Sequence, residues 1–181
     1  MQTRVQALAA VLLTLLSGAA LRAEDKRIEA PDEKTFVIDN AGLISKADAA
    51  KINEIGTKLL ADTHVHLLIL TVKSMSDYGN MNNIEAFAKK FLDDWIKAQP
   101  GKAWTKAALL VRSTNDHKVH IQLGSAWHNS QDKDCQEIYV KTIAPKFGAN
   151  DISGGLADGA AALGKLLTKN IAASSSETDG K

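Results

Sequence analysis

VHLLILTV, at residues 65–72, is the stretch that decides the fold. Four apolar residues, LLIL at 67–70, follow one another in it and predict a strand that is buried on both faces. Such a strand is typical of the centre of a sheet that helices cover on two sides. The run AALLV at residues 107–111 has the same character and predicts a second buried strand.

Two further segments predict the remaining strands. The apolar run FVI at 36–38 ends in the turn sequence DNAG at 39–42. From 118 to 123 polar and apolar residues alternate as KVHIQL, which indicates a strand with one face in water. The polar turn STND at 113–116 joins this strand to the one before it, so we expect an antiparallel hairpin with an edge strand.

Four segments have the apolar spacing of helices. Ser45 and Asp48 resemble a capping box at the start of a helix that runs to about Ala61. A second helix is predicted after Asn83, and a third over 134–147, ending near Pro145. The second and last helices have their apolar residues three or four apart, at Ile84, Phe87, Phe91 and Trp95, and at Ile152, Leu156, Ala160, Leu163, Leu166 and Leu167.

This order of elements predicts an α/β fold. Strands and helices alternate three times before the hairpin, and two right-handed crossovers make the first three strands parallel. We therefore expect a three-layer α/β/α sandwich. Its mixed four-stranded sheet would have three parallel strands plus an antiparallel edge strand from the hairpin, with helices on both faces.

The two ends of the chain are predicted to lie outside this fold. Residues 1–23 resemble a secretory signal peptide with cleavage after Ala20 or Ala23, and an uncleaved N-terminal anchor is the alternative. Residues 24–35 read as a polar leader, 36–169 as the domain, and 170–181 as a disordered polar tail. We thus expect a periplasmic or secreted protein with no transmembrane segment in its mature part.

Composition excludes several classes of protein. The chain of 181 residues is 45% hydrophobic and has a formal net charge of +1, which gives no indication of nucleic-acid binding. Its one cysteine, Cys135, cannot form an intrachain disulfide. Cys135 lies near a predicted helix start, where a thiolate is favoured, but a buried or idle thiol is the more ordinary role.

Oxygen-bearing side chains follow the strands at the end where parallel sheets bind ligands. We predict that Asp39, Asn115 and Asp116 hold a hard cation, Ca²⁺ or Mg²⁺. Asn40 and Asp77 would lie at the margin of this site. The alternatives are that Asp39 bonds to its own backbone as a turn former, and that Asn115 and Asp116 are an ordinary hairpin turn.

Other side chains give weaker indications of function. His64 and His66 share a face at the start of a strand, which suits two ligands of a zinc ion, but no third ligand is evident. Solvent-facing or interface positions are the alternative for both histidines. Trp104 and Trp127 lie in predicted loops and are candidates for a partner surface.

Taken together, the motifs resemble the TPM domain family, which is named for thylakoid and bacterial proteins. The opening VIDNAGLIS at 37–45, the strand at 67–72 and the helix through Phe91 and Trp95 carry the likeness. It continues through ALLV at 108–111, Asn115 and Asp116, VHI at 119–121, IAPKF at 143–147, and Asp151, Gly154, Gly155 and Gly159. The resemblance covers about residues 36–168 of the sequence.

The resemblance implies an exported α/β/α domain and two kinds of function. Some plant members are described as lumenal acid phosphatases, and some members bind calcium. One expectation is therefore a cation-dependent acid phosphatase that acts on phosphomonoesters, with no catalytic residue assigned. The other is a non-enzymatic divalent-cation-binding interaction module that assists the assembly or maintenance of envelope protein complexes. The sequence has no P-loop, CxxxxxR or DxDxT motif, so the phosphatase expectation rests on the resemblance.

Overall fold

A four-stranded sheet forms the centre of the fold. The computed structural model describes residues 26–79, 81–99, 102–127 and 131–178. The first three strands are parallel, the last is antiparallel to the third, and the predicted mixed sheet is confirmed. In order across the sheet the strands are β1 (Val37–Asp39), β2 (Leu67–Val72), β3 (Ala108–Ser113) and β4 (Lys118–Leu123).

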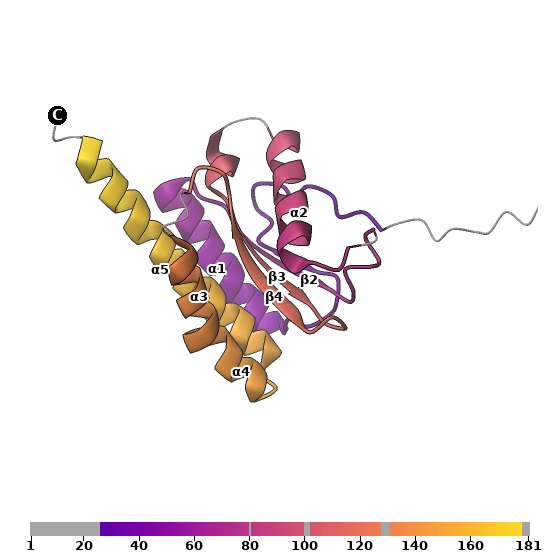
Figure 1. Cartoon of the computed structure of the whole chain (residues 1–181). Coiled ribbons are helices and arrows are strands. Elements are labelled where there is room, and N and C mark those ends of the chain that lie inside the picture. The colour runs from indigo at the N-terminus through magenta and orange to yellow at the C-terminus, as the bar shows by residue number, and fades with distance from the viewer. Residues whose placement is uncertain (1–25, 80, 100–101, 128–130, 179–181) are drawn as a thin grey trace, which may run out of the picture.

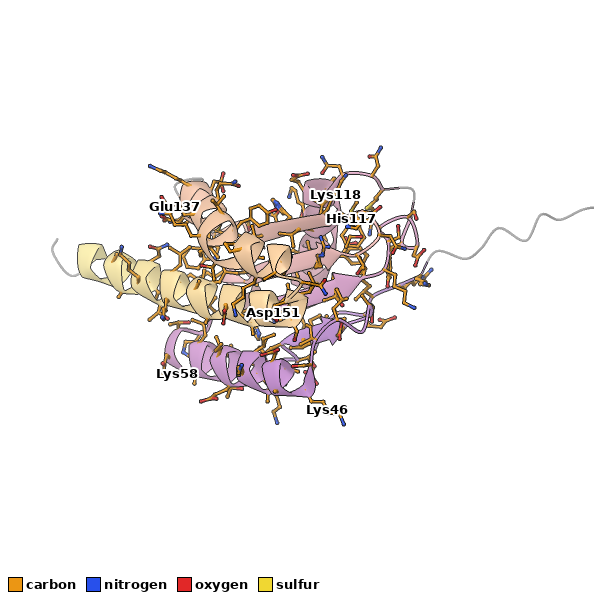
Figure 2. The ribbon with its side chains drawn as sticks, turned by 90° about the horizontal axis from the view of Figure 1, so that it is seen from below. Lys46, Lys58, His117, Lys118, Glu137 and Asp151 are labelled. Carbon is orange, nitrogen blue, oxygen red and sulfur yellow. The ribbon has the colours of Figure 1, made fainter. Side chains whose placement is uncertain are left out.

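Helices cover both faces of this sheet. In Figures 1 and 2, α1 (Lys46–Thr63) and α5 (Ile152–Thr178) lie side by side on one face. Figure 1 shows α2 (Ile84–Ala98) on the other face. Every residue of β2 is buried, because alternate side chains enter the two cores. The core beside α5 includes Leu67, Ile69, Leu110, Leu156 and Leu163, and the core beside α2 includes Leu68, Leu70, Phe87, Leu109 and Val111.

The first helix begins and ends at residues with recognisable capping roles. Ser45 Oγ accepts a hydrogen bond from the backbone N–H of Asp48 at 3.1 Å, as the capping pattern predicted. His64 follows the helix with a left-handed φ of 57° and donates its N–H to Leu60 O at 2.9 Å. A left-handed residue stops a helix, so the chain can turn directly into β2.

The second helix presents one apolar face to the sheet. Asn83 caps α2 by accepting a hydrogen bond at 2.7 Å from a backbone N–H of the first turn. The predicted positions Ile84, Phe87, Phe91 and Trp95 are all buried. The rings of Phe87 and Phe91 lie with centroids 4.8 Å apart, a favourable aromatic separation.

The third predicted helix consists of three pieces in the structure. In place of one helix over 134–147 there are α3 (Asp132–Ile138), a π-helical segment (Tyr139–Ile143) and α4 (Ala144–Gly148). Pro145 accounts for the change, because its nitrogen has no hydrogen to donate and its ring clashes with the carbonyl four residues earlier. A wider π turn before the proline accommodates both effects.

Both ends of the described chain add to the packed domain. The leader contacts α2 and its preceding loop, with Pro31 buried and Lys26 paired with Asp77 at 2.7 Å. A disordered tail was predicted from residue 170, but α5 continues to Thr178, since no Gly or Pro interrupts it there. Residues 1–23, the predicted signal peptide, lie outside the described residues. Within the described ranges, no helix has both the length and the apolar character needed to cross a membrane.

Candidate functional site

The predicted site residues lie at one edge of the sheet. β1 ends at Asp39, and β2 and β3, which run parallel to it, end at Val72 and Ser113. The segment 40–44, the loop 73–77 and the turn 114–117 follow these three strands. Asp39 and these three segments together are called the rim below. Tertiary structure therefore gathers residues that are far apart in the sequence.

Asp39 holds the first segment of the rim in place. Its carboxylate accepts hydrogen bonds from the backbone N–H groups of Leu43 and Ile44, both at 2.9 Å, and from the hydroxyl of Thr71. Partial burial raises the pKa of Asp39, but the hydrogen bonds from Thr71, Ile44, Leu43 and Gly42 outweigh burial and lower the pKa overall. Asp39 therefore remains ionised at neutral pH. Its carboxylate bonds to the backbone of the turn that follows it, which is the alternative role predicted for this residue.

Asp116 joins the other two segments of the rim. Its Oδ2 accepts hydrogen bonds from the hydroxyl of Ser113, from the backbone N–H of Met75 at 2.9 Å, and from Ser74 Oγ at 3.3 Å. These bonds, with Ser113 contributing most, lower the pKa of Asp116. The hairpin turn after β3 is thereby fastened to the loop after β2.

The two carboxylates are fastened from opposite faces of the sheet. Thr71, the donor to Asp39, lies on the face of β2 that packs towards α1 and α5. Ser113, the donor to Asp116, lies on the face of β3 that packs towards α2. Asp39 and Asp116 thus share an edge of the sheet, but each has its own hydrogen-bond donors.

The other predicted residues of the rim, Asn115, Asp77 and Asn40, differ in the bonds that they make. Asn115 is exposed, and its backbone N–H donates to Lys73 O at 2.8 Å. Asp77 is paired with Lys26 at 2.7 Å, which neutralises its charge. Asn40 is exposed and donates its side-chain N–H to Tyr78 at 3.3 Å.

The carboxylate oxygens of the rim are unequally available to a cation. A carboxylate can accept about four hydrogen bonds, and Asp39 already accepts at least three. Asp116 Oδ1 makes only a long 3.5 Å contact with Ser74 Oγ, and the exposed Asn115 is its neighbour in the chain. The donor chemistry of the Asn115–Asp116 turn therefore fits a hard cation better than Asp39 does.

The joint site of Asp39, Asn115 and Asp116 stays a prediction. Among the residues that the structure describes, no three His, Cys, Asp or Glu side chains are grouped as they would be around a metal ion. The predicted set contains two acids, Asp39 and Asp116, and one amide, Asn115. The two acids accept hydrogen bonds from different donors.

Trp104, a candidate for a partner surface, and His66, a candidate zinc ligand, both lie in the core. Trp104 belongs to a 3-10 helix, η1 (Lys102–Lys106), rather than to a loop, and is 2% exposed. Its ring stacks on that of His66 with centroids 4.2 Å apart. Burial lowers the pKa of His66, so it is neutral at pH 7. Trp104 is therefore not available as a partner surface, whereas Trp127 is half-buried and donates to Lys106 O at 2.6 Å.

Cys135 is a buried thiol with low reactivity. It is 8% exposed, and burial, followed by the nearby Asp132 and Asp134, raises its pKa to about 11. The negative charges of these acids oppose the effect that a helix start has on a thiolate. The thiol is therefore protonated at neutral pH.

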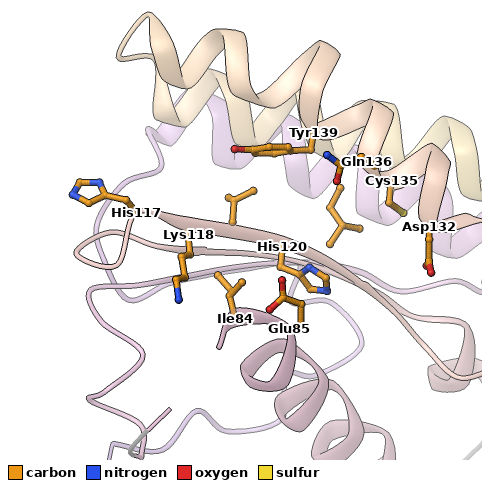
Figure 3. Close-up of a pocket in the computed structure, with 11 residues that line it drawn as sticks. Ile84, Glu85, His117, Lys118, His120, Asp132, Cys135, Gln136 and Tyr139 are labelled. Atoms are coloured by element: carbon orange, nitrogen blue, oxygen red, sulfur yellow. The ribbon is translucent and has the colours of Figure 1, made fainter. Parts of the chain in front are cut away.

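A groove that sequence reasoning missed follows the free edge of β4 (Figure 3), with a volume of about 550 Å³. It is called the β4 groove below. Its residues come from α2, β4, α3 and the π-helical segment, so no local sequence pattern marks it. The alternating polar and apolar residues at 118–123, which predict a strand with one face in water, are an indirect signal. Ile84 and Glu85 form one wall, His120 lies on the floor, and Asp132 and Tyr139 form the other wall. Ile121 also lines the groove.

Comparison with known proteins gives a family match and a shared fold. A family model described as the TPM domain matches residues 37–166. The solution NMR structure of the N-terminal domain of a protein from P. gingivalis aligns with a TM-score of 0.62 at 22% identity, covering 77% of this chain and 86% of that chain. The N-terminal domain of protein cg2496 from Corynebacterium glutamicum aligns with a TM-score of 0.55 at 16% identity, covering 77% and 84%. At these identities the likeness concerns the fold. No curated protein matches the sequence.

Proposed function

This chain belongs to the TPM domain family, and from that premise we propose that it acts, after export, as a divalent-cation-binding interaction module. The turn at Asn115 and Asp116 is the proposed contact with the cation, which is Ca²⁺ or Mg²⁺. Envelope protein complexes are the proposed partners.

One observation carries the proposal: the carboxylates of the rim fasten its own segments. Asp39 holds 40–44 through two backbone N–H groups, and Asp116 holds the loop 73–77 through the N–H of Met75. Their hydrogen bonds lower the pKa of both carboxylates, and a carboxylate with a lowered pKa is a weak base at neutral pH. This arrangement favours an ordered binding surface over proton transfer.

A hard cation would supply charge that the rim needs for binding oxygen ligands. Asp116 Oδ1 and the amide oxygen of Asn115 are of the kind that Ca²⁺ and Mg²⁺ prefer. Without a cation, the rim carries the carboxylates of Asp39, Asp77 and Asp116 against the ammonium group of Lys73, so its balance of charge disfavours acidic groups on a partner. With a cation held at the turn, the same surface would attract carboxylate or phosphate oxygens.

Hydrolysis of phosphomonoesters is the competing expectation, and it would use the same turn. A cation there would neutralise the phosphate and polarise a bound water. Both functions therefore require Asp116, and they differ in whether a bound phosphomonoester is turned over.

Thermal unfolding of the full chain in CaCl₂ and, separately, in MgCl₂ tests cation binding. A ligand that binds only the native state stabilises it, by about 2.7 kcal/mol at roughly 100 times its Kd. We expect Tm to rise with at least one salt, and the rise to be largely lost in Asp116→Asn and Asn115→Ala. The control Asp93→Asn, an exposed acid on α2, should keep the full rise. A Tm that neither salt raises would refute the proposal.

Turnover of p-nitrophenyl phosphate separates the two functions. We expect no hydrolysis above that of the cation in buffer, at acid or neutral pH. Hydrolysis that requires the cation, and that disappears in Asp116→Asn but persists in Asp93→Asn, would establish the phosphatase in place of the module. Asn115→Ala is useful in both assays, because the side chain of Asn115 is exposed and its truncation should not unfold the protein.

A further inference from the structure

The floor of the β4 groove is an open sheet edge. β4 is the last strand in the sheet and pairs with β3 on one side. A strand carries a second row of backbone N–H and C=O groups, which here faces the groove. Such a row is complementary to the backbone of another extended chain, and many peptide-binding domains use it to add a strand.

The two walls give an added strand different environments on its two faces. His120 is registered with Val111 and lies on the α2 side, where Glu85 is the exposed wall residue. Ile121 is registered with Leu110 and lies on the other side, towards the π-helical segment. Alternate side chains of an added strand would therefore face Glu85 and the apolar wall in turn.

Exposed apolar surface accompanies this edge. Among the described residues, the large hydrophobic side chains that are exposed are Tyr139 and Val140, at 36% and 52%. Both belong to the π-helical segment beside the groove, and Tyr139 lines it (Figure 3). π-helical turns are frequent at functional sites. Tyr139 therefore offers an aromatic surface to the apolar face of an added strand.

Carboxylates outnumber ammonium groups in the groove. Glu85 and Asp132 lie in the first turns of α2 and α3, and neither has an ion-pair partner among the described residues. Both lie near enough to His120 to oppose, through their charge, the lowering of its pKa by burial. Lys118 also lines the groove and keeps its positive charge while it donates to Asn82 O, so the two carboxylates outnumber it by one. The groove thus favours a basic side chain opposite Glu85.

We propose that the β4 groove binds an extended segment of a partner polypeptide, in which basic and apolar residues alternate, as a strand added beside β4. The segment would span about five residues, or roughly 17 Å, because the turn and β4 contribute residues 117–121 to the groove. This inference rests on the proposed role as an interaction module, but it uses residues other than the rim acids.

The geometry favours a single strand over other occupants. A second copy would bring the same two acids, Glu85 and Asp132, to the contact, and like charges there oppose pairing. A helix, about 10 Å across, would leave the row of backbone groups unpaired. Self-association through β4 is nevertheless an outcome that the experiment detects.

NMR titration of the full chain with a synthetic peptide tests the proposal. The probe is acetyl-Thr-Lys-Val-Lys-Val-Lys-Thr-amide, and two matched peptides carry N-methyl groups on the lysines or on the valines. In a strand paired along one edge, only one alternate set of N–H groups points at the partner. We therefore expect the parent and one methylated peptide to shift the amide signals of residues 118–123, and the other methylated peptide to bind at least about tenfold more weakly.

Variants of the protein locate the site. Glu85→Lys and Tyr139→Ala should each weaken the parent peptide at least about fivefold, because each removes a contact of the groove. Glu54→Lys, which makes the same charge change on the exposed surface of α1, should leave the affinity unchanged. Circular dichroism shows whether each variant is folded.

Several results would overturn the proposal. The first is that no amide signal shifts at millimolar peptide, or that the shifted signals belong to residues outside the groove. The second is that the two methylated peptides bind equally well, or that neither of them binds. The third is a dimer of the protein in sedimentation whose amide signals change at residues 118–123. Cation binding is measured by the Tm shift alone, and peptide binding by NMR. The protein can therefore bind calcium or magnesium without binding the peptide, or bind the peptide without binding a cation, and the two proposals are refuted separately.

Discussion

Ser153 donates a hydrogen bond from its hydroxyl to the carboxylate of Asp48 at 2.6 Å, across 105 residues of sequence. The same hydroxyl accepts the backbone N–H of Ser45 at 2.8 Å, and Ser45 Oγ donates to Asp48 at 2.8 Å. The three side chains thus tie the start of α5 to the start of α1. The hydrogen bonds from Ser153, Lys51 and Ser45 lower the pKa of Asp48 to about 2.

The first prediction concerns this connection. Because the pKa of Asp48 is lower in the folded chain than its ordinary value of 3.8, its ionised form stabilises the fold above that value, and the contribution is lost as the pH falls to about 2. The difference corresponds to roughly 2 kcal/mol. Asp48→Asn should lower the free energy of unfolding by about 1–2 kcal/mol at pH 7, and the gap to the wild type should close near pH 2. Urea unfolding across this range measures it.

Asp62→Asn is the matched control for that series. Asp62 also lies on α1, but its side chain is 50% exposed and its partner Lys58 is 77% exposed. An exposed pair of this kind contributes about 0–1 kcal/mol. An equal loss in both variants, or a gap for Asp48→Asn that does not depend on pH, would show that the connection to Ser153 is not the cause.

The second prediction concerns the fastening of the rim. Asp116→Ala leaves the N–H of Met75 and the hydroxyl of Ser113 without their acceptor, and an unsatisfied buried group costs about 1–3 kcal/mol. We expect a loss of this size in unfolding experiments. We also expect faster hydrogen exchange at the Met75 amide, with little change in the strands. Asn115→Ala should change stability by less than about 0.5 kcal/mol, and unchanged exchange at Met75 in Asp116→Ala would contradict the role given to Asp116.

The third prediction tests the packing of α1 against Phe36, the residue just before β1. A Cβ added at Gly56 would collide with the ring of Phe36, which is 3% exposed. Overpacking a core costs about 1–3 kcal/mol, which exceeds the gain of up to about 1 kcal/mol in helix propensity. Gly56→Ala should therefore lower Tm.

Gly148→Ala provides the opposite case. Apart from its chain neighbours and the nearby backbone of its own helix, no atom lies within 4 Å of a Cβ added at Gly148, the last residue of α4. Reduced freedom of the unfolded chain should then leave stability unchanged or raise it by up to about 1 kcal/mol. If Gly56→Ala were as well tolerated as Gly148→Ala, Phe36 would have to be loosely packed.

The fourth prediction concerns Cys135. Because burial raises the pKa of its thiol to about 11, the thiolate is scarce at pH 8. A disulfide reagent such as DTNB should react with the native protein at least about tenfold more slowly than with the protein in urea. Cys135→Ala should leave cation binding at the rim unchanged. Rapid modification of the native protein at pH 8 would contradict the protected thiol.

Local sequence predicted most of the elements, because each depends on neighbours in the chain. The run at 67–70 specifies a strand buried on both faces, and Ser45 and Asn83 mark helix starts through bonds to residues three positions on. The π-helical segment before Pro145 was not predicted, since a proline can end a helix or be accommodated by a wider turn. Packing decides between these outcomes.

The sequence by itself determined the order and type of the strands, the edge of the sheet where Asp39 ends its strand and Asp116 follows another, and the family likeness. Only the tertiary structure decided what those side chains do. Each carboxylate finds donors from a strand or loop more than 30 residues away, Thr71 for Asp39 and Met75 for Asp116. The β4 groove likewise draws its walls from α2 and α3. Hydrogen-bond partners and grooves of this kind depend on distances between elements, and a linear pattern of residue types does not contain those distances.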